Sequence, residues 1–143
     1  MIFLNKDIVS VFNVNKDLIV NYKSEGDRYL VDIRRCLSKQ LVYYILYTDL
    51  QKVNNSYFTI IDRLLNDEYE DVYKFKKDCS EFNNIQKVFL KSCEGFIDEN
   101  VMEDVKHDIE KLDLLIQRLI YILENICYDE SEDIHKNEVH SIF

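Results

Sequence analysis

Apolar residues recur at alternating steps of three and four along most of the chain, which is the pattern of amphipathic helices. The pattern is clearest between residues 102 and 126, where it continues for more than three heptads. The first half of this stripe has charged flanks, at Lys106, Asp108 and Asp113, but the second half has apolar ones. A helix that is apolar on more than one face belongs in the middle of a bundle. We therefore expect the stripe to be buried within one chain, at Ile109, Leu112, Ile116, Leu119 and Leu123.

Shorter stretches with the same period precede this helix. In one of them, residues 41–47 are apolar on all sides, so we expect other helices to enclose them. Polar clusters at 54–56 and 83–84 are expected to end helices, because Asn and Ser favour caps and turns. A third cluster, at 66–67, either ends a helix or lies within one that continues through it. These breaks predict four to five helices.

The N-terminal residues 1–22 alternate between apolar and polar positions, which predicts a small β-hairpin or meander. A frayed helix that starts at Asp7 is the alternative. Residues 128–143 are acidic at first and show no period, so we expect an acidic flexible tail. The expected fold is mainly α: a compact bundle of four to five helices with that β element. It forms a single domain over 1–127, with its helices in 27–127.

Composition narrows the class of protein. The 143 residues suit one domain, and 47% apolar with 31% charged residues is typical of a globular chain rather than a disordered one. No run reaches the about 18 apolar residues of a transmembrane segment, and the N-terminus lacks the pattern of a signal peptide. We therefore expect an intracellular, cytoplasmic protein, in its own cell or in a host cell. The chain has no Ala and no Pro, and 13 Lys against 5 Arg. This bias is typical of AT-rich genomes, which include those of poxviruses, many phages and low-GC bacteria, and apicomplexan parasites.

The sequence shows no motif of a known catalytic or cofactor site. It contains no GxSxG, HExxH, P-loop or dinucleotide-binding glycine motif. One histidine, His107, follows a glutamate by four residues, which is an ordinary pairing on an exposed helix face. The four cysteines lie on or beside apolar stripes, and we expect them to be reduced thiols: Cys36, Cys79, Cys93 and Cys127. We therefore expect neither enzymatic activity nor a metal or other cofactor.

Charge is distributed unevenly along the chain. Residues 1–53 hold 8 basic and 6 acidic residues, a balance of +2, whereas residues 54–143 hold 10 basic and 21 acidic ones, a balance of −11. The overall charge of −9 disfavours general nucleic-acid binding, because phosphates repel an acidic surface. The acidic part suits a protein partner with a basic surface. Its candidate contacts lie at predicted helix ends or on polar faces, at Asp67, Glu68, Glu70, Asp71, Asp98, Glu99, Glu103 and Asp104.

A second candidate surface is basic and aromatic. Arg28, Arg35 and Lys39 are seven and four residues apart, so they share one face of a helix. Tyr43 and Tyr47 follow closely, and tyrosine is favoured at interfaces because it combines a large apolar ring with a hydroxyl. This face is the alternative binding site, for an acidic partner, a phosphate or another anionic ligand.

These features predict protein–protein interaction without catalysis. The expected protein is a small acidic regulator or inhibitor, of the immunity, anti-defence or viral host-response antagonist type, that docks on a protein partner. One alternative is a structural subunit of a larger assembly that forms a homodimer through the last helix. The other is an anion-binding protein that uses the Arg28, Arg35 and Lys39 face.

Overall fold

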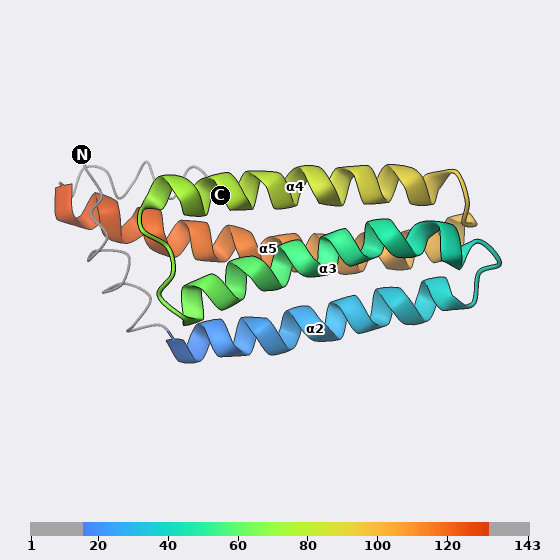
Figure 1. The fold of residues 1–143 in the computed structure, drawn as a ribbon, viewed down its shortest axis with the longest axis horizontal. Helices are drawn as coiled ribbons and strands as arrows, with labels where there is room; N and C mark the ends of the chain where they lie inside the picture. The colour runs from blue at the N-terminus through green and yellow to red at the C-terminus, as the bar shows by residue number, and fades with distance from the viewer. Residues whose placement is uncertain (1–15, 132–143) are drawn as a thin grey trace.

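The computed structural model describes the chain from residue 16 to residue 131, and its side chains up to residue 124. Four helices make up this part: α2 (Lys16–Ser38), α3 (Tyr43–Leu65), α4 (Val72–Glu94) and α5 (Glu99–Ser131). Consecutive helices run in opposite directions and are joined by short loops (Figure 1). α3 packs on α2 and α4, and α5 packs on α4 and α2, so the four helices surround one core. The prediction of a mainly helical bundle is confirmed.

The two ends of the bundle differ in their connections. The loops 39–42 and 95–98 lie at the same end, at the right of Figure 1, which we call the two-loop end. The loop 66–71 joins α3 to α4 at the opposite end, the one-loop end. A residue near the start of α5 is therefore close to the end of α2 and far from the loop 66–71.

The β element predicted for residues 1–22 is not found in its described part. Residues 16–22 form the first turns of α2, and residues 1–15 lie outside the described residues. Ile19 and Tyr22 are buried at helical spacing, whereas Leu18 is half-buried and Val20 is exposed. The alternation of apolar and polar residues in this segment arises because Leu18 and Val20 are apolar although they lie outside the core. Between residues 16 and 131 the chain has no strand.

Two of the predicted helix breaks are wrong. Residues 54–56 lie inside α3 and residues 83–84 lie inside α4. Asn55 and Asn84 are exposed on the outer side of their helices, while buried residues on the inner side continue the apolar stripe. Packing of that inner stripe outweighs the weak preference of asparagine for a turn, which is a few tenths of a kcal/mol (roughly 0.7 at most).

Of the two alternatives left open at 66–67, the structure shows the helix end. Asp67 has a φ of 55°, in the left-handed region that short polar residues tolerate, and α3 ends just before it. Two aspartates then begin the following helices as N-caps. The Asp71 carboxylate accepts a hydrogen bond from the backbone N–H of Lys74 (2.8 Å), and Asp98 accepts one from the N–H of Val101 (3.1 Å).

The apolar stripe of the last helix forms part of the core, as predicted. All five residues expected there are buried: Ile109, Leu112, Ile116, Leu119 and Leu123. Their partners lie in the same chain, on α2 and α4. A homodimer through this stripe would therefore require the bundle to open.

Beyond Leu123, α5 continues to Ser131, so the first residues of the predicted tail are helical. The remainder, 132–143, lies outside the described residues. Among the four helices described, none has a segment long and apolar enough to span a bilayer.

Candidate docking surface

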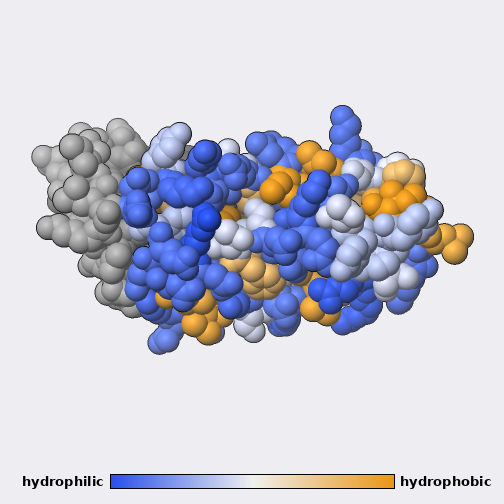
Figure 2. All heavy atoms as spheres, in the orientation of Figure 1, coloured by the Kyte–Doolittle hydropathy of each residue, from blue (hydrophilic) through white to orange (hydrophobic). Residues whose placement is uncertain are grey.

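Large apolar side chains are exposed at the two-loop end. Leu41 is 97% exposed, Tyr44 76%, Phe96 48% and Ile45 42%. Figure 2 shows hydrophobic residues at the surface of this end of the molecule, at the right of the view, and further ones along the bundle. We call these four residues the apolar cap. The expectation that other helices enclose residues 41–47 is wrong here, because α2 ends at Ser38 and α3 starts only at Tyr43.

The residues of the apolar cap lie at the same end of the α3–α4 seam. The Ser92 hydroxyl of α4 donates a hydrogen bond to Asp49 of α3 over 3.1 Å. Ile45 lies one turn of α3 closer to the two-loop end than Asp49. α4 ends at Glu94, and Phe96 follows in the loop 95–98, where its backbone N–H donates a hydrogen bond to the Cys93 carbonyl over 3.0 Å. The apolar cap therefore draws on the loop 39–42, the start of α3 and the loop 95–98.

Acidic residues border the apolar cap. Five of them are exposed at the end of α4 and the start of α5: Glu94, Asp98, Glu99, Glu103 and Asp104. None of the five forms an ion pair within the described part of the chain. The result is an apolar centre beside a strip of carboxylates without cationic partners, which is the layout of a protein interface with an apolar core and a polar rim.

The structure separates the eight candidate acidic contacts into two groups. Asp98, Glu99, Glu103 and Asp104 lie at the two-loop end, in the loop before α5 and in its first turns. The other four belong to the loop at the one-loop end: Asp67, Glu68, Glu70 and Asp71. The 23 residues of α4 separate these groups by about 35 Å, at about 1.5 Å per residue. One flat partner surface of ordinary size does not reach both.

The alternative basic and aromatic face is divided as well. Arg28 lies in the middle of α2, with its guanidinium 5.9 Å from the centre of the Tyr29 ring. Arg35 lies in the last turn of α2 and pairs with Asp32 at 3.6 Å, with both side chains largely exposed.

The rest of that face lies at the two-loop end, close to the apolar cap. Tyr43 and Tyr47 are in edge-to-face contact at the start of α3, with ring centres 5.8 Å apart. The charges of Lys39 and Asp104 both influence the pKa of the Cys36 thiol. The end of α2, which holds Cys36, therefore lies close to the start of α5. The part of each candidate surface that lies at the two-loop end therefore adjoins the other, whereas Arg28 and the acidic residues of the loop 66–71 lie elsewhere.

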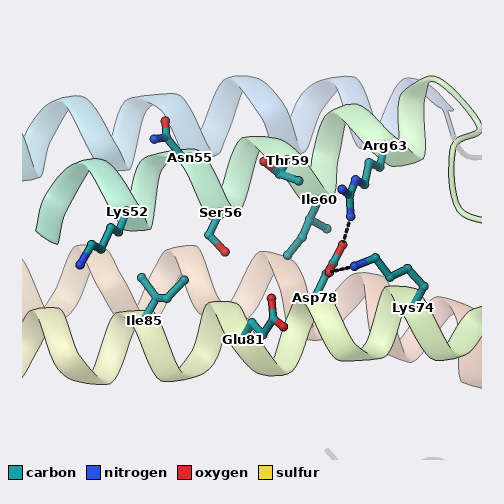
Figure 3. A pocket seen from close by; sticks show the side chains of 10 residues that line it. All are labelled: Lys52, Asn55, Ser56, Thr59, Ile60, Arg63, Lys74, Asp78, Glu81 and Ile85. Atoms are coloured by element: carbon teal, nitrogen blue, oxygen red, sulfur yellow. Dashed lines mark hydrogen bonds and ion pairs between the residues drawn. The ribbon is translucent and has the colours of Figure 1, made fainter. Parts of the chain in front are cut away.

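A polar hollow of about 370 Å³ lies along the α3–α4 seam (Figure 3). Ser56 and Thr59 of α3 line it, with Glu81 of α4 opposite. At its end Arg63 and Lys74 both point to Asp78, at 2.6 Å and 3.2 Å. These two cations are therefore already paired with Asp78. The third cation that lines the hollow, Lys52, lies 3.8 Å from the Asp49 carboxylate.

Asp78 joins the loop 66–71 to the helices. Its side chain is buried, and the Tyr69 hydroxyl donates a second hydrogen bond to the same oxygen that Arg63 contacts, over 2.7 Å. Burial alone would raise the pKa of Asp78, but hydrogen bonds from Tyr69, Lys74 and Arg63 outweigh burial and lower the pKa. The same burial and the nearby carboxylate raise the pKa of the Tyr69 phenol far above its usual value. This arrangement holds the loop and its acidic residues in place.

The described cysteines lack the features of reactive thiols. Cys36, Cys79 and Cys93 are free, and Cys79 and Cys93 are buried. Burial, together with nearby aspartates, raises the pKa of both buried thiols to about 12, so the nucleophilic thiolate is scarce at neutral pH. In the part of the chain with described side chains, no three His, Cys, Asp or Glu residues converge as metal ligands would.

The exposed apolar cap was missed at the sequence level. The available signal was the run 41–47 itself, which is apolar on every face and longer than one buried helix face needs.

Comparison of the chain with protein-family models, with curated proteins and with solved structures finds no match.

Proposed function

We propose that this protein is a binding protein that docks through its two-loop end on an apolar patch of a partner protein, with basic side chains around that patch. The observation that carries the proposal is the apolar cap with unpaired carboxylates beside it. Burying the exposed side chains of Leu41, Tyr44 and Phe96 would contribute most of the affinity, since large apolar anchors dominate binding energy. The carboxylates would speed association with a basic surface and discriminate against acidic ones.

A role as a small acidic regulator or inhibitor fits this docking mode. A surface at one end of a rigid bundle can cover a functional site on a partner without any chemistry of its own. The acidic strip favours a partner whose own site is basic. The test of the proposal is whether binding depends on the two-loop end more than on the rest of the surface.

Tyr44→Ser is expected to weaken partner binding at least tenfold, chiefly through faster dissociation, because it removes an exposed aromatic anchor. Tyr73→Ser is the matched control. Tyr73 is 74% exposed on α4 next to the one-loop end, so it has the same side chain and nearly the same exposure as Tyr44. Wild type and both variants would serve as baits in extract of the native host, and retained proteins would be identified by mass spectrometry. The partner should be retained by wild type and Tyr73→Ser, and lost by Tyr44→Ser.

Equal loss in the two tyrosine variants would show that docking does not use the apolar cap. Retention by Tyr44→Ser with loss by Tyr73→Ser would assign docking to the one-loop end instead. Both side chains are exposed, so neither substitution should change the melting temperature by more than about one or two degrees. That measurement confirms that a loss of binding comes from the surface and not from unfolding.

The charge contribution has its own expected result. Glu99→Lys with Glu103→Lys should slow association with the isolated partner about tenfold at low salt and reduce the salt dependence of the rate. The control pair, Glu68→Lys with Glu70→Lys, makes the same change in net charge at the other end of the bundle. Association rates would be measured by surface plasmon resonance at several salt concentrations. If both pairs slow association equally, the overall charge matters and the acidic strip has no local role.

A further inference from the structure

We infer that the α2–α5 interface contains a proton-dependent contact, in which the buried carboxyl group of Asp108 holds a proton beside the carboxyl group of Asp32, and the two groups repel each other once that proton is lost. This contact concerns the stability of the bundle and holds whether or not the two-loop end is the docking surface. It rests on an arrangement of side chains that the remainder of the fold does not explain.

Asp108 is buried without a compensating partner. Its side chain is only 6% exposed, on the face of α5 that packs against α2. One carboxylate oxygen, Oδ2, is fully buried and has no hydrogen-bond partner. An ionised carboxylate in such a place costs free energy, because neither water nor a donor replaces its hydration.

The groups that face Asp108 are acidic. Asp32, on α2, lies within hydrogen-bond reach of it, and Asp104 precedes it by one turn on α5. The Cys36 thiol of α2 lies in the same cluster, since the charges of Asp32, Asp104 and Asp108 all raise its pKa, in addition to burial. On α4, the other helix packed on α5, no cation forms an ion pair with Asp108 within the described part of the chain.

Two cations lie at the edge of this cluster. Arg35 reaches Asp32 at 3.6 Å with an exposed guanidinium, and Lys39 acts on Cys36. Neither forms an ion pair with Asp108. Because Oδ2 has no accessible surface, a proton is the one cation that can reach it without moving a helix.

A carboxyl pair of this kind is stable with one proton and one negative charge. Burial is the main cause that raises the pKa of Asp108, with the charges of Asp32 and Asp104 adding to it, and the pKa reaches about 7. The unfolded chain has the ordinary value of 3.8, so between these two values the folded protein binds the extra proton. The stabilising contribution is therefore complete below about pH 4 and is lost as the pH rises through about 7.

The test compares the intact wild-type chain with Asp108→Asn, Asp32→Asn and the double variant. Asparagine has the shape of aspartate and needs no proton to remain neutral. From pH 5 to pH 8, the unfolding equilibrium constant of wild type should rise at least about tenfold relative to that of Asp108→Asn. Asp32→Asn should reduce this pH dependence less than Asp108→Asn does, because burial, the main cause, still raises the pKa of Asp108 in that variant. The double variant should match Asp108→Asn, since both lack the group that titrates. Glu110→Gln, at an exposed position on the same helix, is the control and should keep the wild-type pH dependence.

A second measurement needs no variant. The carboxyl carbon of Asp108 in the folded wild type, followed by NMR, should titrate near neutral pH and not near 4. An ordinary titration of Asp108, or an Asp108→Asn variant with the same pH dependence of unfolding as wild type, would overturn the proton-dependent contact.

Discussion

Replacing Gly26 with alanine is expected to destabilise the bundle by about 2–3 kcal/mol, although alanine normally favours a helix over glycine. Gly26 is buried in the middle of α2, where that helix crosses Tyr57 of α3. A Cβ atom at this position would overlap the tyrosine ring and lie 2.6 Å from its hydroxyl oxygen. Equilibrium unfolding in denaturant would measure the loss.

The Tyr57 ring cannot move away easily. It is fully buried, its hydroxyl donates a 2.6 Å hydrogen bond to the Tyr22 carbonyl, and its ring packs against Phe58 and Phe82. Burial, the first cause, together with the nearby Glu25, raises the pKa of this phenol far above its usual value, so it remains a hydrogen-bond donor. A Cβ on Gly26 therefore forces α2 and α3 apart along their contact.

Gly95→Ala is the matched control, because Gly95 lies in a loop with right-handed backbone angles and its nearest contact would be the Ser92 carbonyl at 3.8 Å. We expect it to be neutral or to stabilise the protein by up to about 1 kcal/mol, since alanine restricts the unfolded chain. Adding Tyr57→Leu to Gly26→Ala should recover part of the lost stability by making room for the Cβ. If Gly26→Ala is as stable as wild type, the close approach of the two helices is not a constraint on the fold.

The positions of the helices could be predicted from periodicity, but most of their ends could not. The stripe through Ile116 was predictable because its spacing fits only a helix and its flanks are apolar. The exposed Asn55 and Asn84 resemble turn residues in sequence, and only the packing of the opposite helix face shows that they lie mid-helix. Conversely, the connection at 39–42 has no Gly or Pro to mark it.

The features that matter most for a candidate site depend on contacts between helices. Leu41 belongs to an apolar run that predicts burial, and it is exposed because the chain turns at that point. Asp108 has a position on the charged flank of its stripe, yet α2 covers it. Gly26 differs from any other tolerated glycine only through Tyr57, 31 residues further along the chain. Pairings over such distances leave no local pattern in the sequence.

Asp78→Ala is expected to cost about 2–3 kcal/mol at neutral pH, the range for charge-assisted hydrogen bonds and a buried group left unpaired. The substitution removes the acceptor shared by Arg63 and Tyr69 and the partner of Lys74. Arg63 and Lys74 are partly exposed and regain water, which limits their share of the cost. The Tyr69 hydroxyl is buried and cannot replace its lost hydrogen bond with one to water. The loop 66–71 should therefore lose its attachment to α4.

The pH dependence of that cost distinguishes Asp78 from Asp108. Because the pKa of Asp78 is lowered in the folded state, its contribution is present above the ordinary value of 3.8 and is lost as the pH falls through the lowered one. The difference in unfolding free energy between wild type and Asp78→Ala should therefore shrink below about pH 4, whereas Asp108 disfavours the fold as the pH rises towards 7.

Glu81→Ala is the control for this prediction, because Glu81 is an exposed acid on the same helix and lines the same hollow. It should change stability by no more than about 0.5 kcal/mol, as an exposed side chain away from buried contacts does. Tyr69→Phe should fall between the two, since it removes one of the three donors to Asp78 and keeps the ring, which packs edge-to-face on Phe75. Equal losses in Asp78→Ala and Glu81→Ala would mean that removing negative charge from α4 destabilises the bundle. The hydrogen bonds to Asp78 would then have no special role in holding the loop.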